Sequence, residues 1–239
     1  MKESEAKLSE IYHPLWEKFN SEQYGQSVSL FAGRLIVNGF DISWFENKVC
    51  LDAGCGSGRY IQAMLDLKAK EVIGLDLNPA IAISKINDSR AKILSADLRK
   101  ISYPDQHFDF VCCNGVLHHT ENPKEILNEL GRVLKINGYM FLFVFDPYNA
   151  DWEMIDALRA AAQKFPMERL QNHFKKHLNL PENVIYNYCD LMYAPIQIKF
   201  TREELLKMLK GYEVHFMEQP YASYDSKNEN RLFARKLIS

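Results

Sequence analysis

The stretch Val49-Cys50-Leu51-Asp52-Ala53-Gly54-Cys55-Gly56-Ser57-Gly58 decides the fold of this 239-residue chain. Its short apolar run predicts a buried strand, and its closely spaced glycines predict a tight turn into a helix over Arg59–Leu67. Glycines let a ligand approach bare backbone, and the free N–H groups at a helix start attract anionic groups. A plain tight turn between strand and helix is the structural alternative. The glycines alone leave the two interpretations nearly level.

Apolar runs and helical patterns alternate after this turn. The sequence predicts strands at Glu71–Leu75, Ala91–Ser95, Phe108–Cys113 and Tyr139–Phe145. It predicts helices after Asn78-Pro79 and over Lys124–Lys135, the second closed by Gly138. Unbroken apolar strands separated by helices are typical of a parallel sheet that is covered on both faces. The predicted fold class is therefore α/β, with a Rossmann-like sheet flanked by helices.

Four consecutive parts of one domain follow from this pattern. Residues 1–46 form an N-terminal helical cap with helices at Glu5–Phe19 and Gln26–Phe40, and residues 47–149 form the core. Residues 150–199 form a lid insertion, helical over Asp151–Leu178 and irregular over Pro181–Pro195. Residues 200–239 contain a capped helix at Thr201–Lys210 and two edge strands, Tyr212–Met217 and Arg231–Leu237.

Three aspartates stand at or near the ends of successive predicted strands: Asp52, Asp76 and Asp97. Each one alone could be a solvated loop carboxylate. Ligands of open α/β sheets bind at the carboxyl ends of the strands, and an acid after the second strand can accept hydrogen bonds from ribose hydroxyls. The three acids together favour a nucleotide-containing ligand over three unrelated surface charges.

Four segments of the core resemble, in order and spacing, the motifs of the class I S-adenosylmethionine-dependent methyltransferases. They are LDAGCGSGRY (51–60), VIGLDLNP (72–79), ILSADL (93–98) and HFDFVCCNGVLHH (107–119). They are similar to the broad type 11 group that includes the ubiquinone and menaquinone methyltransferases. The resemblance implies a seven-stranded sheet whose last strand is antiparallel, S-adenosylmethionine as cofactor, and methyl transfer to a small-molecule acceptor.

The resemblance also implies roles for individual residues in binding S-adenosylmethionine. The turn around Cys55 approaches the methionine moiety through Gly54, Gly56 and Gly58, and Asp52, just before the turn, is placed either to meet the ammonium or to order the loop. Asp76, next to Leu77, holds the ribose. Asp97 and Leu98 frame the adenine, and the backbone of Asn114 lies near the methionine amino group.

Two other interpretations compete with this one. An NAD-dependent dehydrogenase also has a glycine turn and an acid, but its fingerprint is GxGxxG, whereas this chain has GxGxG followed by Arg59. A catalytically silent S-adenosylmethionine-binding or sensor protein on the same fold is harder to exclude, because a fold does not prove chemistry.

The acceptor side is less clearly marked. His118 or His119 could act as a base or orient an acceptor, although one could instead cap the next segment while the other faces solvent. Tyr24, Asp146, Trp152 and Tyr193 are further candidates for lining the acceptor site. The first helices and residues 150–199, with aromatic residues such as Tyr12 and Trp16, are expected to close over it. A (D/N)PP(Y/F) motif is missing after the fourth strand, which disfavours amide and adenine N-methylation.

Composition sets the remaining expectations. Lys and Arg total 29 against 31 Asp and Glu, a formal charge of −2, which predicts no nucleic-acid partner. The charged N-terminus and the short apolar runs predict no signal peptide and no membrane span, so a cytoplasmic protein is expected. Five cysteines without a CxxC pair predict buried thiols and no metal site.

Overall fold

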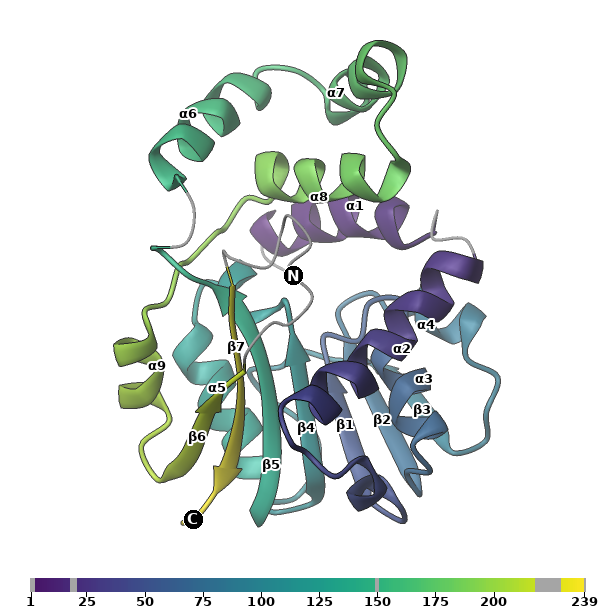
Figure 1. The fold of residues 1–239 in the computed structure, drawn as a ribbon, viewed down its shortest axis with the longest axis vertical. Coiled ribbons are helices and arrows are strands. Elements are labelled where there is room, and N and C mark those ends of the chain that lie inside the picture. The colour runs from purple at the N-terminus through teal and green to yellow at the C-terminus, as the bar shows by residue number, and fades with distance from the viewer. Residues whose placement is uncertain (1–2, 18–20, 149–150, 218–228, 239) are drawn as a thin grey trace.

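A computed structural model describes residues 3–17, 21–148, 151–217 and 229–238, and its centre is a seven-stranded sheet of order β3-β2-β1-β4-β5-β7-β6 (Figure 1). The strands are β1 (Val49–Ala53), β2 (Glu71–Asp76), β3 (Ala91–Ser95), β4 (Phe108–Asn114), β5 (Leu134–Phe145), β6 (Tyr212–Phe216) and β7 (Glu229–Lys236). The pairs from β3 to β5 are parallel, and β7 runs antiparallel to both β5 and β6. The predicted fold class is confirmed, including the antiparallel last strand.

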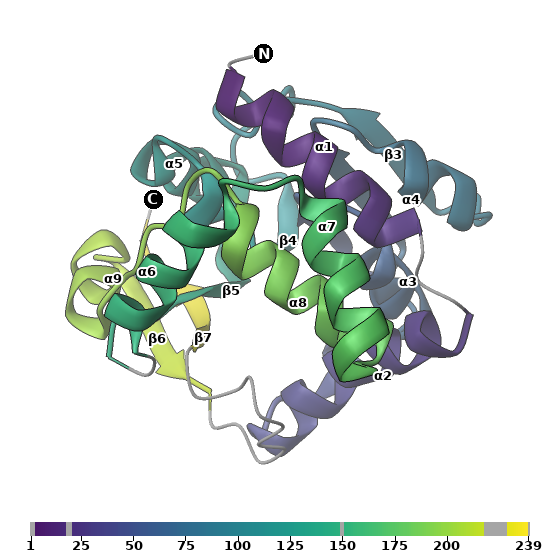
Figure 2. The ribbon, with the colours of Figure 1, turned by 90° about the horizontal axis from the view of Figure 1, so that it is seen from above.

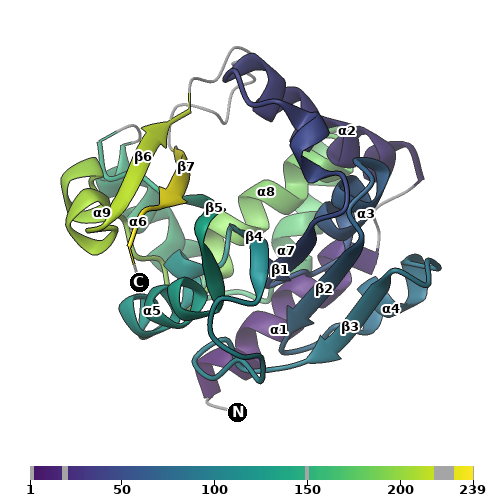
Figure 3. The same cartoon turned by 90° about the horizontal axis from the view of Figure 1, so that it is seen from below.

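Helices cover both faces of this sheet. Seen from below (Figure 3), α2 (Ser21–Val37) and α3 (Arg59–Asp66) lie on one side, whereas α5 (Pro123–Val133) and α9 (Arg202–Met208) lie on the other. On the first side, Phe31 of α2 makes edge contacts with the rings of Phe45, Phe110 and Phe141. All four side chains are fully buried, and burial of one such ring contributes about 1.5–3 kcal/mol.

The boundary between α5 and β5 differs from the prediction. The helix ends at Val133 and the strand begins at Leu134, ahead of the glycine that was expected to close the helix. The register against β4 shifts between Phe108 and Phe110, and Asn137 has a φ of +63°. A Cβ on Gly138 would lie 2.8 Å from the carbonyl oxygen of Asp109. This glycine therefore lets the backbones of β5 and β4 approach each other closely where their register shifts.

A helical layer lies over the carboxyl ends of the strands. It consists of α1 (Glu3–Glu17), α6 (Trp152–Ala162), α7 (Met167–His173), the π-helical turn η3 (Phe174–Leu178) and α8 (Glu182–Tyr193). Seen from above, α1 and α8 run side by side across the sheet (Figure 2). Phe19, the expected end of the first helix, lies outside the described residues. No helix in the described ranges is long and apolar enough to cross a membrane.

The segment between Pro181 and Pro195 is helical, so the expectation of an irregular stretch there is wrong. Ile185, Cys189 and Met192 recur at helical spacing and are buried, which gives α8 an inward apolar face. The prolines mark its ends, because Pro181 precedes the first turn and Pro195 follows the C-cap residue, where neither one interrupts a helical hydrogen bond.

Candidate active site

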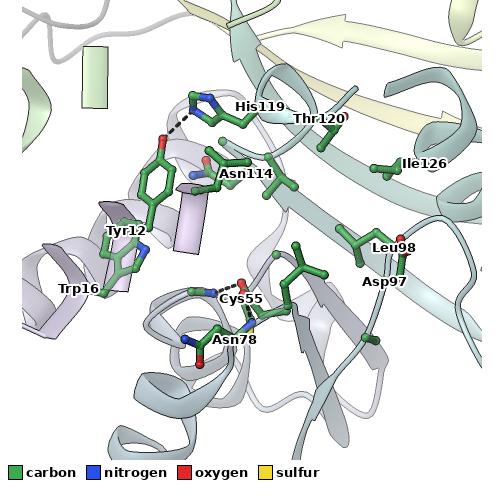
Figure 4. A pocket seen from close by; sticks show the side chains of 18 of the residues that line it. Tyr12, Trp16, Cys55, Asn78, Asp97, Leu98, Asn114, His119, Thr120 and Ile126 are labelled. Atoms are coloured by element: carbon green, nitrogen blue, oxygen red, sulfur yellow. Dashed lines mark hydrogen bonds between the residues drawn. The ribbon is translucent and has the colours of Figure 1, made fainter. Parts of the chain in front are cut away.

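A cavity lies between the carboxyl ends of β1 to β4 and the overlying α1. It is lined by many of the residues that the sequence singled out, namely Gly54, Cys55, Gly56, Asp76, Leu77, Asp97, Leu98, Asn114 and His119. Figure 4 shows Asp97 and Leu98 on one side of this cavity, Tyr12 and His119 above it and Cys55 below. Sequence positions spread over more than sixty residues therefore meet at one edge of the sheet, as parallel topology requires.

The glycine turn between β1 and α3 has the conformation that glycine allows. Gly54, Gly56 and Gly58 have φ values of +80°, +50° and +79°. A Cβ on Gly54 would lie 2.2 Å from a methyl carbon of Val116, and one on Gly56 would lie 3.1 Å from the indole nitrogen of Trp16. Both backbone strain and close approach therefore exclude larger residues at Gly54.

Asp76 ties this turn to the tip of β2. Its Oδ2 accepts a hydrogen bond of 2.9 Å from the Gly56 N–H, and its Oδ1 accepts one of 3.0 Å from the Asn78 N–H. Burial raises the pKa of Asp76, although these backbone donors favour its charged form. The carboxylate keeps lone pairs that face the cavity and can accept further hydrogen bonds.

Asp97 stands at the opposite side of the cavity and is paired with a residue that sequence reasoning missed. Arg99 donates hydrogen bonds of 2.6 to 2.9 Å to both carboxylate oxygens of Asp97. These bonds lower the pKa of Asp97. The pair is close in sequence, and an acid followed two positions later by an arginine was the available signal.

Asp52 lies beneath the turn and does not line the cavity. It is 1% exposed, and burial raises its pKa to about 7, while the nearby Arg59 acts in the opposite direction. Its Oδ2 and the Oγ of the cavity-lining Ser57 have no hydrogen-bond partner among the described residues. Buried polar atoms are rarely left unpaired. The cavity-lining Ser57 Oγ fits the methionine end of S-adenosylmethionine, whose ammonium offers a donor and whose carboxylate offers an acceptor. Asp52, contrary to its predicted contact with the cofactor, lies behind the turn.

The N-terminal helix α1 forms the roof of the cavity. Leu8, Tyr12, His13 and Trp16 line it from this helix. The guanidinium of Arg59 lies 4.6 Å from the centre of the Trp16 ring, and Lys85 donates a hydrogen bond to the Trp16 carbonyl oxygen. The first helix, which the sequence predicts to close over the acceptor, thus lies against the cavity; closure over an acceptor stays a prediction.

Of the two histidines, only His119 reaches the cavity. It belongs to the short turn η2 (Leu117–His119), in which successive side chains point in different directions. His119 Nδ1 lies 2.8 Å from the Ile196 carbonyl oxygen, and its Nε2 lies 2.8 Å from the Tyr12 hydroxyl oxygen (Figure 4). The Tyr12 hydroxyl also donates a hydrogen bond to Asp190 Oδ1 of α8.

His118 is instead part of the apolar core, contrary to its proposed place in the acceptor site. It is 1% exposed, and its ring centre lies 4.0 Å from that of Phe145 and 5.5 Å from that of Phe143. Desolvation lowers the pKa of His118 well below its usual value, so the ring is neutral. A neutral histidine enclosed by aromatic rings does not meet an acceptor in the cavity.

The other acceptor-lining candidates do not line this cavity either. Trp152 Nε1 donates to the Asp146 carbonyl oxygen at 2.7 Å, and both residues are buried at the base of α6. The Tyr193 hydroxyl oxygen lies 3.1 Å from the Ala162 carbonyl oxygen and 3.2 Å from that of Phe165, so its one hydrogen can be donated to either, which holds α8 against the end of α6. Tyr24 is partly buried on α2, with Lys85 Nζ 5.0 Å from its ring centre. Trp152 and Tyr193 therefore hold the lid helices in place, whereas Tyr24 belongs to α2.

Comparison with known proteins agrees with this geometry. Residues 51–142 match the family described as "Methyltransferase domain". A tRNA U34 carboxymethyltransferase of Helicobacter pylori is 33% identical over 107 residues, which are 41% of this chain and 40% of that relative. The chain thus matches less than half the length of that protein.

Solved structures share the fold at low sequence identity. Magnesium protoporphyrin IX methyltransferase from Synechocystis, solved with S-adenosylhomocysteine, has a TM-score of 0.58 at 16% identity, covering 97% of this chain and 95% of its own. The 1,6-didemethyltoxoflavin-N1-methyltransferase of Burkholderia thailandensis also has a TM-score of 0.58 at 16% sequence identity. The match covers 98% of this chain and 87% of that structure.

The tRNA-modifying relative corrects one expectation. The prediction of a small-molecule acceptor with no nucleic-acid partner is contradicted, because that relative is named for a tRNA nucleoside. The formal charge of −2 could not exclude such a partner, since it sums the whole surface, whereas binding depends on where charges lie.

The motif segments lie within or overlap the matched region, and the sheet has the predicted order of parallel and antiparallel strands. The chain therefore carries a methyltransferase domain on the fold of the class I S-adenosylmethionine-dependent methyltransferases, the family that its motifs resemble.

Proposed function

We propose that this protein transfers a methyl group from S-adenosylmethionine to an acceptor that meets the cavity beside Tyr12 and His119. The observation that carries the proposal is the convergence of the glycine turn, Asp76 and Asp97 on one cavity. When bound, the cofactor supplies a methyl group already activated by a sulfonium. The chain then has to hold, align and enclose the two reactants, which can account for much of a rate enhancement.

The cavity offers a separate place for each part of the cofactor. The turn at Gly54–Gly58, with the unpaired Ser57 Oγ, supports binding of the amino-acid end. The Asp76 carboxylate supports binding of the ribose hydroxyls. Asp97 and the apolar side chain of Leu98, which both line the cavity, support binding of the adenine. The backbone of Asn114 completes the methionine side.

The acceptor class that the relatives favour is RNA, and specifically a tRNA. Exposed cations on the lid support an anionic acceptor. They are Lys164, Arg169, Lys175 and Lys176. Lys175 Nζ lies 2.7 Å from Glu182 Oε1, and this ion pair partly neutralises the positive charge that Lys175 presents to an acceptor. Arg169 belongs to α7, and Lys175 and Lys176 belong to η3; α7 lies in the helical layer over the carboxyl ends of the strands (Figure 1).

The first experiment separates an enzyme from a silent binding protein. Calorimetry should show micromolar binding of S-adenosylmethionine and S-adenosylhomocysteine and none of NAD. Labelled methyl groups from S-adenosylmethionine are then followed into unmodified bulk tRNA and into a protein-free metabolite extract, with Asp76→Ala as the inactive control. Binding without transfer to either fraction would favour the sensor interpretation, and binding of NAD alone would refute the family assignment.

A further inference from the structure

Three side chains from distant parts of the chain form a hydrogen-bonded chain above the cofactor cavity. Tyr12 comes from α1, His119 from η2 and Asp190 from α8; together they are called the trio below. The Tyr12 hydroxyl contacts both His119 Nε2, at 2.8 Å, and Asp190 Oδ1. His119 Nε2 and Asp190 Oδ1 lie 3.6 Å apart, and His119 is 5% exposed.

The number of hydrogens in the trio does not match its contacts. The Ile196 carbonyl oxygen can only accept, so His119 Nδ1 carries a hydrogen and donates it at 2.8 Å. In a neutral histidine, Nε2 is then an acceptor, and an ionised Asp190 is also an acceptor. Tyr12 has one hydroxyl hydrogen and cannot donate it to both. With neutral His119 and ionised Asp190, one of the two contacts is left without a hydrogen.

One additional proton satisfies every contact. If His119 is protonated, Nε2 donates to the Tyr12 oxygen and Tyr12 donates to Asp190. Such charge-assisted hydrogen bonds are roughly twice as strong as neutral ones. The trio therefore has hydrogen-bonding capacity for one additional proton, and two of its members, Tyr12 and His119, line the cavity.

We propose that the trio receives the proton that the methyl acceptor loses, with the Tyr12 hydroxyl as the group that touches the acceptor. This inference rests on the proposed function. Tyr12 is the catalytic residue in this scheme, and Asp190 is a positioning residue that acts through it.

The acceptor X–H bond breaks while its electron pair stays on X, which forms the bond to the methyl carbon as the sulfonium becomes a neutral thioether. The proton passes to the Tyr12 oxygen, and the hydroxyl hydrogen of Tyr12 passes to His119 Nε2. The products are protonated His119, hydroxyl Tyr12 and ionised Asp190, so no other reactant is needed.

The charged and titratable groups around the trio act in opposite directions. The pKa of His119 is lowered overall, chiefly by desolvation and to a smaller extent by Arg159 of α6, whereas Asp190 and the hydrogen bond to the Ile196 carbonyl oxygen raise it. Arg159 is held in place by hydrogen bonds to the carbonyl oxygens of Leu191 and Ala194. The neutral His118 is the titratable neighbour on η2. Burial and Asp190 raise the pKa of Tyr12, which disfavours a phenolate and fits a hydroxyl that relays protons.

Proton linkage tests this proposal without knowledge of the acceptor. S-adenosylmethionine and S-adenosylhomocysteine share the same adenosine and amino-acid ends and differ by the positive charge at sulfur. That charge, bound beneath the trio, disfavours its additional proton. Calorimetric titrations from pH 5.5 to 8.5, in buffers of different ionisation enthalpy, measure the protons released with each ligand. We expect more release with S-adenosylmethionine, with a difference of up to about one proton.

Variants assign this difference to the trio. Asp190→Asn and Tyr12→Phe should remove most of it, whereas Glu182→Gln, the same chemical change at an exposed position of α8, should leave it intact. Asp52 and Asp76 remain in every variant, so any protons that they release on ligand binding are released in every variant. The proposal that the trio receives the proton would be overturned by equal proton release for the two ligands in the unaltered protein, or by an undiminished difference in Asp190→Asn. Failure of both ligands to bind would instead refute the proposed function.

A second measurement covers variants that bind ligand poorly. In ¹⁵N-histidine-labelled protein without ligand, His119 should show the Nδ1–H tautomer. Its titration midpoint should fall by at least one pH unit in Asp190→Asn, equivalent to about tenfold weaker proton binding. An unchanged midpoint in that variant would contradict the proposal.

Discussion

The carboxylate of Asp76 accepts the backbone N–H of Gly56 at 2.9 Å, so the tip of β2 holds the turn that leaves β1. The residue expected to bind the ribose therefore also fixes the loop expected to bind the methionine end. The two halves of the cofactor site depend on one side chain, and damage to it affects both.

Replacement of Asp76 by Ala should weaken S-adenosylhomocysteine binding by about 1.5–3 kcal/mol or more, because the ribose loses a charged acceptor. Calorimetry measures the loss, and circular dichroism should show that the fold is retained. Asp88→Ala, which removes a partly buried aspartate paired with Arg90 and outside the cavity lining, is the matched control and should bind normally. Equal affinities for Asp76→Ala and the unaltered protein would show that the ribose binds elsewhere.

Replacement of Gly54 by Ala should lower the free energy of unfolding by about 1–3 kcal/mol, because its Cβ would overlap Val116 and its φ is +80°. Gly33→Ala in α2 is the control. A Cβ there meets nothing within 4 Å, and alanine in a helix stabilises by about 0.5–1 kcal/mol. Urea unfolding of both variants shows whether each substitution raises or lowers the free energy of unfolding. A Gly54→Ala protein as stable as Gly33→Ala would contradict the assigned role of the turn.

The cofactor half of the site could be predicted because its signals are local. A glycine turn after an apolar run and acids after strands retain their meaning without knowledge of distant contacts. The adjacent histidines were different, because the side chains of His118 and His119 point in different directions from a short helical turn. No alternation pattern in the sequence indicated which one reaches the cavity.

The acceptor side could not be predicted because it is built from long-range contacts. Tyr12 and Asp190 are 178 positions apart, and the alignment of α1 with α8 that joins them has no sequence signature. The sequence predicts that Trp152 and Tyr193, as aromatic residues of the lid, line the acceptor site. Their polar atoms instead bond to backbone carbonyls and hold the lid helices together.

Stability should depend on pH through Asp52. Burial raises its pKa in the folded protein to about 7, above the ordinary value of 3.8. The folded state then holds a proton that the unfolded state lacks between about pH 4 and 7, so stability should fall as pH rises through that interval. Melting temperatures of ligand-free Asp52→Asn should decline less from pH 5 to 7 than those of the unaltered protein. Parallel curves for the two proteins would show that Asp52 is ionised throughout.

Replacement of Trp16 by Ala should speed the release of S-adenosylhomocysteine, because this ring closes the roof over Gly56. A Cβ on Gly56 would lie 3.1 Å from the Trp16 indole nitrogen, and Arg59 stacks on the other part of the ring at 4.6 Å. Loss of these contacts should raise the dissociation constant about tenfold, or ~1.4 kcal/mol.

The same variant distinguishes a local roof from a general loss of fold. Methylthioadenosine has the adenosine part but no amino-acid end, so its weaker binding should change much less in Trp16→Ala. Stopped-flow displacement gives the two dissociation rates. If both ligands were released faster by the same factor, Trp16 would act on the adenosine side or on the whole cavity. If neither rate changed, α1 would not cover the bound cofactor. The cofactor would then not lie between the glycine turn and Trp16.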